Sequence, residues 1–117
     1  MPDVPASTSG LTAKHCKPCE KGAAPLSVEE SRDLLGKLDS WELAQDNSEI
    51  VRSFRFKNFH QTMAFVNALA WIAHQEDHHP NLEVGYGRCT VRYSTHAIGG
   101  LSENDFICAA KIDALLG

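Results

Sequence analysis

The segments with strand character come in two close pairs, and this spacing restricts the fold more than any other feature of the chain. Trp41 and Leu43 alternate with polar residues, and residues 49–57 resume the alternation after a turn-forming Asp-Asn-Ser. A second pair of strands is predicted in residues 82–87 and 88–96. Connections this short join antiparallel strands, because parallel strands need a crossover of a dozen or more residues.

Three helices are predicted around these hairpins from their N-terminal capping residues. Capping patterns, in which a small polar residue precedes an acidic or amide residue by three positions, occur at Ser27–Glu30, Asn58–Gln61 and Ser102–Asp105. The predicted helices span residues 27–38, 58–78 and 103–116. The order α-β-β-α-β-β-α predicts an α+β fold, a four-stranded antiparallel sheet with the helices packed on one face.

The chain has the length of one domain, since 117 residues can bury a single core. Residues 1–25 are rich in Pro, Ser, Thr, Gly, Lys and Ala and are predicted to form a flexible N-terminal tail, with 26–117 as the folded domain. The net charge of −4 argues against binding of nucleic acid, and no apolar run is long enough to cross a membrane. Without a visible secretory signal, the four cysteines are expected to be free thiols in the cytoplasm.

Four of the six histidines fall at the ends of predicted elements, where side chains from different elements can meet: His74, His78, His79 and His96. Imidazole has an ordinary pKa of about 6.5, so it can transfer protons near neutral pH. Pro80 ends the helix and holds the backbone of His79 extended. The HHP motif therefore directs two imidazoles in fixed and different directions, as acid–base catalysis needs. Solvent-exposed histidines at loop ends are the alternative interpretation.

Asp105 supports two interpretations. As the third residue after Ser102, it caps the last helix by accepting a backbone N–H. It also lies one loop away from His96, where its carboxylate could orient an imidazole. The cap is the safer interpretation, and both roles are compatible.

Two patterns raise the question of a metal site. His74 and His78 are four residues apart, as in zinc-binding helices, but Gln75 stands where that motif needs a glutamate. Cys16 and Cys19 form one C-x-x-C pair, which supplies only half of the four ligands of a structural zinc. The pair also lacks the βαβ context of a thioredoxin-type redox site. We therefore predict that no metal takes part, with zinc as the open alternative.

A longer stretch of the sequence is similar to a known family. The motifs are HHPNLEVGYGRCTVRYSTHAIGGLSENDF, together with SW and FRFKNF upstream. Residues 27–116 resemble pterin-4a-carbinolamine dehydratase, which recycles the pterin cofactor of aromatic amino acid hydroxylases. The resemblance implies the same fold and the elimination of water from 4a-hydroxytetrahydropterin to give quinonoid dihydropterin, with neither metal nor bound cofactor. The HCKPC tail is similar to an extension of some bacterial members, which favours a bacterial source.

The resemblance also assigns the site. The catalytic candidates are His78, His79, His96 and Asp105, and the substrate-binding candidates are Pro80, Thr95, Ala97, Ile98, Trp41 and His74. Trp41 and Asp105 are expected at the margin of the cleft. His74 replaces a glutamate of the animal enzymes, which leaves that glutamate's contribution open here. The chemistry needs one imidazolium to protonate the leaving hydroxyl and one neutral imidazole to accept the N5 proton.

A function of another class is the alternative. Animal members of the family also serve as a dimerisation cofactor of a homeodomain transcription factor, so this chain could be a non-catalytic dimerisation or partner-binding module. The intact HHP and STH motifs favour catalysis, because a scaffold does not need three histidines. The resemblance implies a homodimer or homotetramer, with phenylalanine hydroxylase as the expected bacterial partner.

The middle helix is apolar around much of its circumference. Between Met63 and Ala73, only Asn67 is a clear polar break. A helix on one sheet face needs an apolar stripe of about 100° or somewhat more. A wider apolar face that stays exposed usually marks an interface. We therefore predict a homo-oligomer with the outer face of residues 63–73 at or near a contact, or else a helix buried within one subunit.

Overall fold

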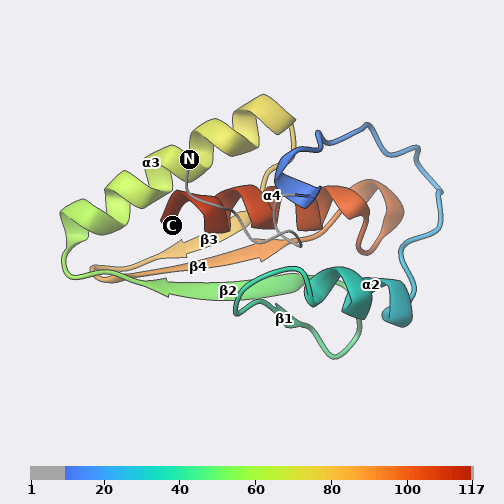
Figure 1. Cartoon of the computed structure of the whole chain (residues 1–117), viewed down its shortest axis with the longest axis horizontal. Helices are drawn as coiled ribbons and strands as arrows, with labels where there is room; N and C mark the ends of the chain where they lie inside the picture. The colour runs from blue at the N-terminus through green and yellow to red at the C-terminus, as the bar shows by residue number, and fades with distance from the viewer. Residues whose placement is uncertain (1–9, 117) are drawn as a thin grey trace.

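The computed structural model describes residues 10–116, which form one sheet with helices on one of its faces (Figure 1). The elements are α2 (Val28–Leu35), β1 (Glu42–Leu43), β2 (Ile50–Arg55), α3 (Phe59–Glu76), β3 (Asn81–Val84), β4 (Arg88–Tyr93), the 3-10 helix η1 (His96–Ile98), α4 (Glu103–Asp113) and the 3-10 helix η2 (Ala114–Leu116). The strands are antiparallel in the order β1-β2-β4-β3. The predicted α+β fold and element order are confirmed. Within residues 10–116, no helix is both long and apolar enough to cross a membrane.

The helices begin at the predicted caps. The Ser27 hydroxyl accepts the Glu30 N–H at 3.1 Å, and the Glu30 carboxylate accepts the Ser27 N–H at 3.0 Å. The Asn58 side chain accepts a backbone N–H at 2.8 Å at the start of α3. This helix ends at Glu76, because Asp77 adopts the left-handed conformation with φ 50°. The HHP motif therefore follows the helix rather than forming its last turn.

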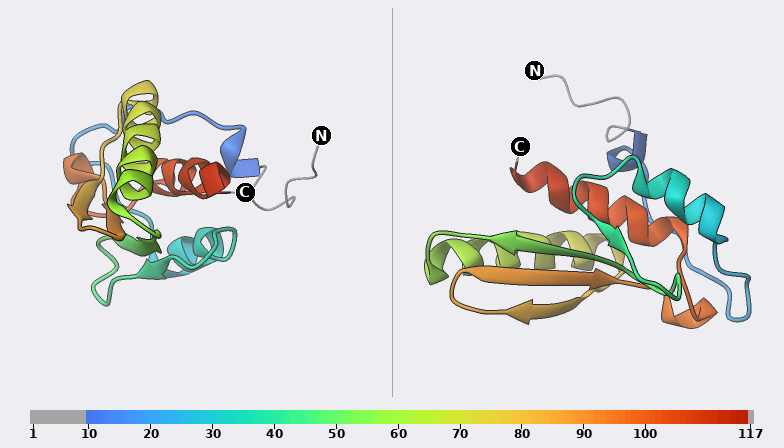
Figure 2. Two further views of the ribbon diagram at one scale, coloured as in Figure 1. Left: turned by 90° about the vertical axis from the view of Figure 1, so that its left-hand side faces the viewer. Right: turned by 90° about the horizontal axis from the view of Figure 1, so that it is seen from below.

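The core lies between the inner face of the sheet and helices α3 and α4. The strand register pairs Ile50 with Tyr93 and Phe54 with Cys89, and all four side chains are buried. Phe65 of α3 packs on Phe54 with ring centroids 4.6 Å apart. Helix α4 lies between α3 and α2 and contacts both (Figure 2). This packing brings the end of β4, the end of α3 and the start of α4 together.

The N-terminal segment contacts the folded domain at several points. The composition predicts a flexible tail up to residue 25, but Leu11 is buried in the core. The segment then passes over the ends of α3 and α4 before it reaches α2 (blue in Figure 1), with hydrogen bonds to both helices. Leu11 and these hydrogen bonds attach residues 11–17 to the domain, although the composition is that of an unstructured segment. The flexibility of the tail stays a prediction. Residues 1–9 lie outside the described part of the chain.

Candidate active site

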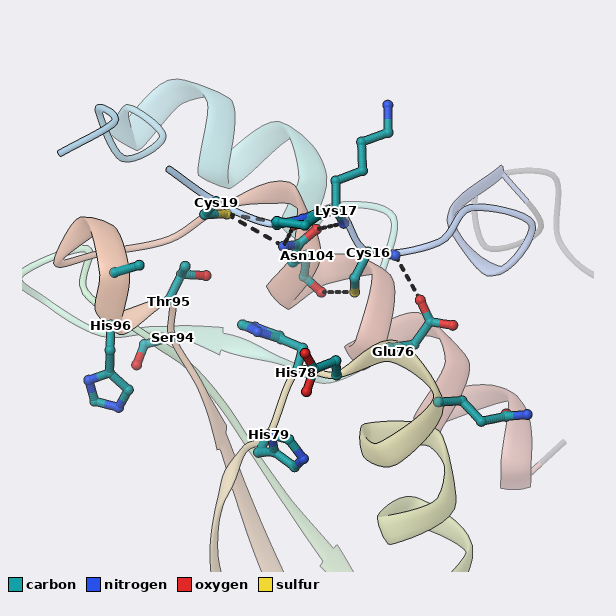
Figure 3. Close-up of a pocket in the computed structure, with 14 residues that line it drawn as sticks. Cys16, Lys17, Cys19, Glu76, His78, His79, Ser94, Thr95, His96 and Asn104 are labelled. Atoms are coloured by element: carbon teal, nitrogen blue, oxygen red, sulfur yellow. Dashed lines mark hydrogen bonds between the residues drawn. The ribbon is translucent and has the colours of Figure 1, made fainter. Parts of the chain in front are cut away.

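A cleft of ≈580 Å³ lies where these chain segments meet (Figure 3). Its walls come from the N-terminal segment, the end of α3 with the loop that follows it, the end of β4 with η1, and the start of α4. The lining residues are 16–19, 75–79, 94–97 and Asn104. The cleft thus joins the HHP and STH motifs, which are separated in sequence by two strands.

The central interaction of the site pairs His78 with Asp105. The Nε2 atom of His78 lies 2.6 Å from Oδ1 of Asp105, and the two side chains are 13% and 0% exposed. Burial of the imidazole opposes its charged form, but the hydrogen bond and negative charge of Asp105 outweigh this effect and raise the pKa of His78. The pair therefore favours an imidazolium at His78, with Nε2 engaged by the carboxylate.

Asp105 is held in place through its second oxygen. Oδ2 accepts the Thr95 hydroxyl at 2.8 Å and the Ser102 N–H at 3.0 Å. Thr95 follows β4, and the Ser102 N–H belongs to the N-cap residue of α4. Asp105 therefore caps the helix and partners an imidazole at once, but the imidazole is that of His78 and not the His96 suggested by sequence distance.

Tyr93 fixes the ring of His78 from the sheet side. The two rings stack with centroids 5.2 Å apart and an interplanar angle of 17°. The Tyr93 hydroxyl donates to the backbone oxygen of His78 at 3.2 Å. Burial raises the pKa of Tyr93, so this hydroxyl keeps its proton at neutral pH. His78 is consequently held by a strand on one side and a helix on the other.

His79 and His96 are exposed and line the same cleft, as does Ala97. The rings of His78 and His79 point in different directions (Figure 3), as the HHP motif predicts. His96 begins the 3-10 turn η1, which closes because Gly99 adopts φ 67° and Thr95 pairs with Gly100. Two exposed imidazoles therefore accompany the buried one.

Several predicted site residues do not line this cleft. The Trp41 indole donates to Asp113 at 2.8 Å, at the opposite end of α4 from Asp105, and does not line this cleft, so its contact with the substrate stays a prediction. The indole is drawn to Asp113 because its N–H needs an acceptor when the ring is buried. His74 packs against Trp71 on the exposed side of α3, with ring centroids 5.7 Å apart and an interplanar angle of 34°, and lines a separate pocket.

Two further substrate-binding candidates lie beside the cleft. Pro80 and Ile98 are half-buried and directly follow the lining residues His79 and Ala97, but they are not themselves among the residues that line it. Their contact with the substrate stays a prediction.

The zinc alternative loses its geometric basis. Because α3 ends at Glu76, His78 lies outside the helix, and the four-residue spacing no longer places it on one helical face with His74. The two side chains also line different pockets. Among residues 10–116, no three His, Cys, Asp or Glu side chains are grouped so that they could hold a metal ion.

Sequence reasoning missed several lining residues. Glu76 belongs to the same short stretch as the HHP motif, and Asn104 directly precedes Asp105, so proximity to the recognised motifs was the available signal. Residues 16–19 were visible as a C-x-x-C pattern, but no rule connects that pattern to a cleft formed by residues 60 or more positions away.

The fold and site together indicate a small α+β enzyme of the acid–base class, because three histidines, which can transfer protons near neutral pH, line one cleft. A family model described as pterin 4 alpha carbinolamine dehydratase matches residues 24–115. The chain is 62% identical over 107 residues to a Nitrosomonas eutropha protein, covering 91% of this chain and 93% of that one. It is 58% identical over 110 residues to a Legionella pneumophila protein, covering 93% and 97%. Both relatives are provisionally named pterin-4-alpha-carbinolamine dehydratase.

The chain therefore belongs to the pterin-4a-carbinolamine dehydratase family of carbon–oxygen lyases. Among solved structures, a transcriptional coactivator/pterin dehydratase from Brucella melitensis matches with a TM-score of 0.76 and 34% identity, over 80% of this chain and 99% of that one. A pterin dehydratase-like protein identified as a RuBisCO assembly factor in the alpha-carboxysome matches with a TM-score of 0.59 and 28% identity, over 68% and 92%. The resemblance stated from the motifs is confirmed.

Proposed function

We propose that the cleft around His78 is where this family member eliminates water from a 4a-hydroxytetrahydropterin to give the quinonoid dihydropterin. The observation that carries this proposal is the buried contact of 2.6 Å between His78 and Asp105, with two exposed histidines around the same cleft. The reaction consumes no co-reactant: the C4a–O bond breaks, N5 loses its proton, and the hydroxyl leaves as water.

His78 is the proposed acid. A hydroxyl is a poor leaving group unless it is protonated as its bond to carbon breaks, so the acid must keep its proton near neutral pH. Asp105 raises the pKa of His78 in that direction, against the effect of burial. Because Nε2 is engaged by Asp105, the proton is donated from Nδ1.

One of the exposed imidazoles, His79 or His96, is the proposed base. The base must be neutral to accept the N5 proton, so it must be an imidazole other than the one that Asp105 holds charged. Both rings lie in the lining of the cleft that contains His78. His78 is therefore assigned as the acid because it is paired with a carboxylate, and the base is one of the two histidines that are exposed in the cleft.

A partner-binding role is the second candidate. It is favoured by the structural match to a protein identified as a RuBisCO assembly factor. A partner-binding role does not require a buried histidine–aspartate pair. Burying the carboxylate of such a pair costs free energy and needs compensating hydrogen bonds. The intact pair therefore supports catalysis as the main function of this chain.

We also propose a homo-oligomer that uses the outer face of α3. This helix buries Thr62, Phe65, Leu69 and Ala73 against the rest of the subunit. Its other side exposes Ala64, Asn67, Ala70 and Trp71, and the Trp71 side chain is 60% exposed. A second copy of the chain would cover this apolar surface.

The cytoplasm is the proposed compartment of the protein. The four cysteines are free, which supports a reducing compartment such as the cytoplasm. The enzyme that supplies the substrate would be an aromatic amino acid hydroxylase, with phenylalanine hydroxylase as the proposed partner.

The test of the proposed function is a stopped-flow dehydration assay. A 4a-hydroxytetrahydropterin is generated freshly, and formation of the quinonoid product is followed with and without the full-length protein. We expect the protein to accelerate dehydration in proportion to its concentration. A rate equal to that of spontaneous dehydration would refute the catalytic function and leave the partner-binding candidate.

A further inference from the structure

The segment formed by residues 16–19, here called the C-x-x-C segment, has no role in the chemistry described above. It nevertheless supplies four consecutive lining residues of the cleft. It passes along one side of the cleft, and the rings of His79 and His96 lie on the other side (Figure 3). The family model begins at residue 24 and so does not include it.

The first anchor of this segment is Glu76 at the end of α3. One carboxylate oxygen accepts the Cys16 N–H at 2.7 Å, and the other lies 2.9 Å from Nδ1 of His15. The Glu76 side chain is only 6% exposed, and Lys111 lies 3.9 Å away. A buried carboxylate therefore holds the segment two residues before His78.

The second anchor is Asn104 at the start of α4. Its side-chain oxygen accepts the Lys17 N–H at 3.0 Å, and its NH₂ group donates to the Lys17 carbonyl at 2.6 Å. One amide thus satisfies both backbone groups of one residue, as a neighbouring strand would. Asn104 directly precedes Asp105, so this anchor also lies next to the catalytic pair.

Sulfur contacts complete the attachment. The Cys16 thiol lies 3.6 Å from the backbone oxygen of Asn104 and 3.6 Å from the sulfur of the buried Cys108. The Asn104 amide also contacts the Cys19 sulfur at 3.5 Å. An arm that merely covered the surface would not need a buried carboxylate, a buried amide and a buried thiol as partners.

We propose that the C-x-x-C segment is a wall of the pterin site that contributes to substrate binding, and that Glu76 and Asn104 are positioning residues that hold this wall against the cleft. This proposal rests on the proposed function for the identity of the ligand. It predicts a specific kinetic signature: a wall that contacts substrate and transition state alike lowers KM without changing kcat. Detaching the segment should therefore raise KM and leave kcat unchanged, because His78 and Asp105 keep their positions.

The experiment uses Glu76→Ala and Asn104→Ala in the full-length protein, with Glu103→Ala as the matched control. Glu103 lies on α4, as Asn104 does, and forms an ion pair at 3.1 Å with Lys14, which precedes the C-x-x-C segment. Glu103 is exposed and does not line the cleft. We expect both anchor variants to raise KM about fivefold or more, with kcat within about twofold, and the control to change neither.

A second readout reports the segment directly. The rate at which iodoacetamide alkylates Cys16, measured by peptide mass spectrometry, should rise in both anchor variants and stay unchanged in Glu103→Ala. In the wild-type protein, 7,8-dihydropterin at saturating concentration should slow alkylation of Cys19, which lines the cleft.

The outcomes separate the two proposals. If KM is unchanged in variants whose Cys16 reacts faster, the C-x-x-C segment does not contribute to substrate binding. If the alkylation rate of Cys16 is unchanged in both variants, Glu76 and Asn104 do not hold the segment in place. A wild-type protein without dehydratase activity would refute the proposed function alone. In that case protection of Cys19 by the dihydropterin would still support the wall, and its absence would overturn it.

Discussion

Replacing Asp105 with asparagine tests the acid role of His78 most directly. The substitution keeps the shape of the side chain but removes the charge 2.6 Å from Nε2. The asparagine oxygen can still accept from Thr95 and Ser102, as Oδ2 does now. Its NH₂ group then faces His78, and an NH₂ group donates only to a ring nitrogen that carries no proton. Asp105→Asn should therefore favour the neutral imidazole.

The size of the effect follows from the lost interaction. Two unit charges about 4 Å apart interact by about 4 kcal/mol at an effective dielectric constant of about 20, which gives the scale of the lost attraction. A charge-assisted hydrogen bond contributes about 1.5–3 kcal/mol net. The Asp77 charge and the Tyr93 and Cys108 side chains around the ring are unchanged in the variant. Since about 1.4 kcal/mol is a tenfold change in an equilibrium, the imidazolium population above neutral pH should fall by about 10- to 100-fold.

The assay is the pH dependence of kcat for dehydration, with the spontaneous rate subtracted at each pH. We expect the alkaline limb of the Asp105→Asn profile to move to lower pH, with activity partly recovered under acidic conditions. Asp113→Asn is the matched control, because it makes the same change at the other end of α4, where the carboxylate binds Trp41 and Arg52. A folded Asp105→Asn protein with the wild-type alkaline limb would refute His78 as the acid.

The remaining predictions concern the exposed histidines, the N-terminal anchor, assembly and metal. His79→Ala and His96→Ala should each lower kcat by about 10²-fold or more, and wild-type rates in both would contradict the histidine mechanism. Burial opposes the charged form of Glu76, but bonds from Cys16 and His15 and the Lys111 charge outweigh it and lower its pKa. Its contribution to stability is therefore present above the ordinary pKa of glutamate and lost as the pH falls through the lowered value. The difference in unfolding free energy between the wild type and Glu76→Gln should shrink accordingly in urea titrations from pH 6 to pH 3. Asn67→Glu on the outer face of α3 should shift light scattering towards smaller species with the helical circular dichroism retained, whereas a monomeric wild type at micromolar concentration would exclude the proposed contact. Chelators should leave activity intact, and stoichiometric zinc in untagged protein whose activity a chelator abolishes would reverse this expectation.

The local patterns of the sequence determined the elements and their order. Ser27 and Asn58 start helices because their side chains satisfy backbone donors within three residues, which is a contact that sequence spacing specifies. The alternation in β4 places Cys89, Val91 and Tyr93 on the buried face, because successive side chains of a strand point to opposite sides. The HHP and STH motifs likewise identify the three histidines that line the cleft.

Only the tertiary structure decided which of these groups interact. Asp105 bonds to His78, 27 positions earlier in the chain, rather than to the nearer His96, because the packing of α4 against α3 places its first turn beside the end of α3. The same packing turns Trp41 towards Asp113 and away from the cleft. The C-x-x-C segment reaches the site through contacts with residues 60 and more positions away, such as Glu76. Spacing along the chain predicts contacts within a turn of helix or across a hairpin, whereas these contacts depend on how whole elements pack.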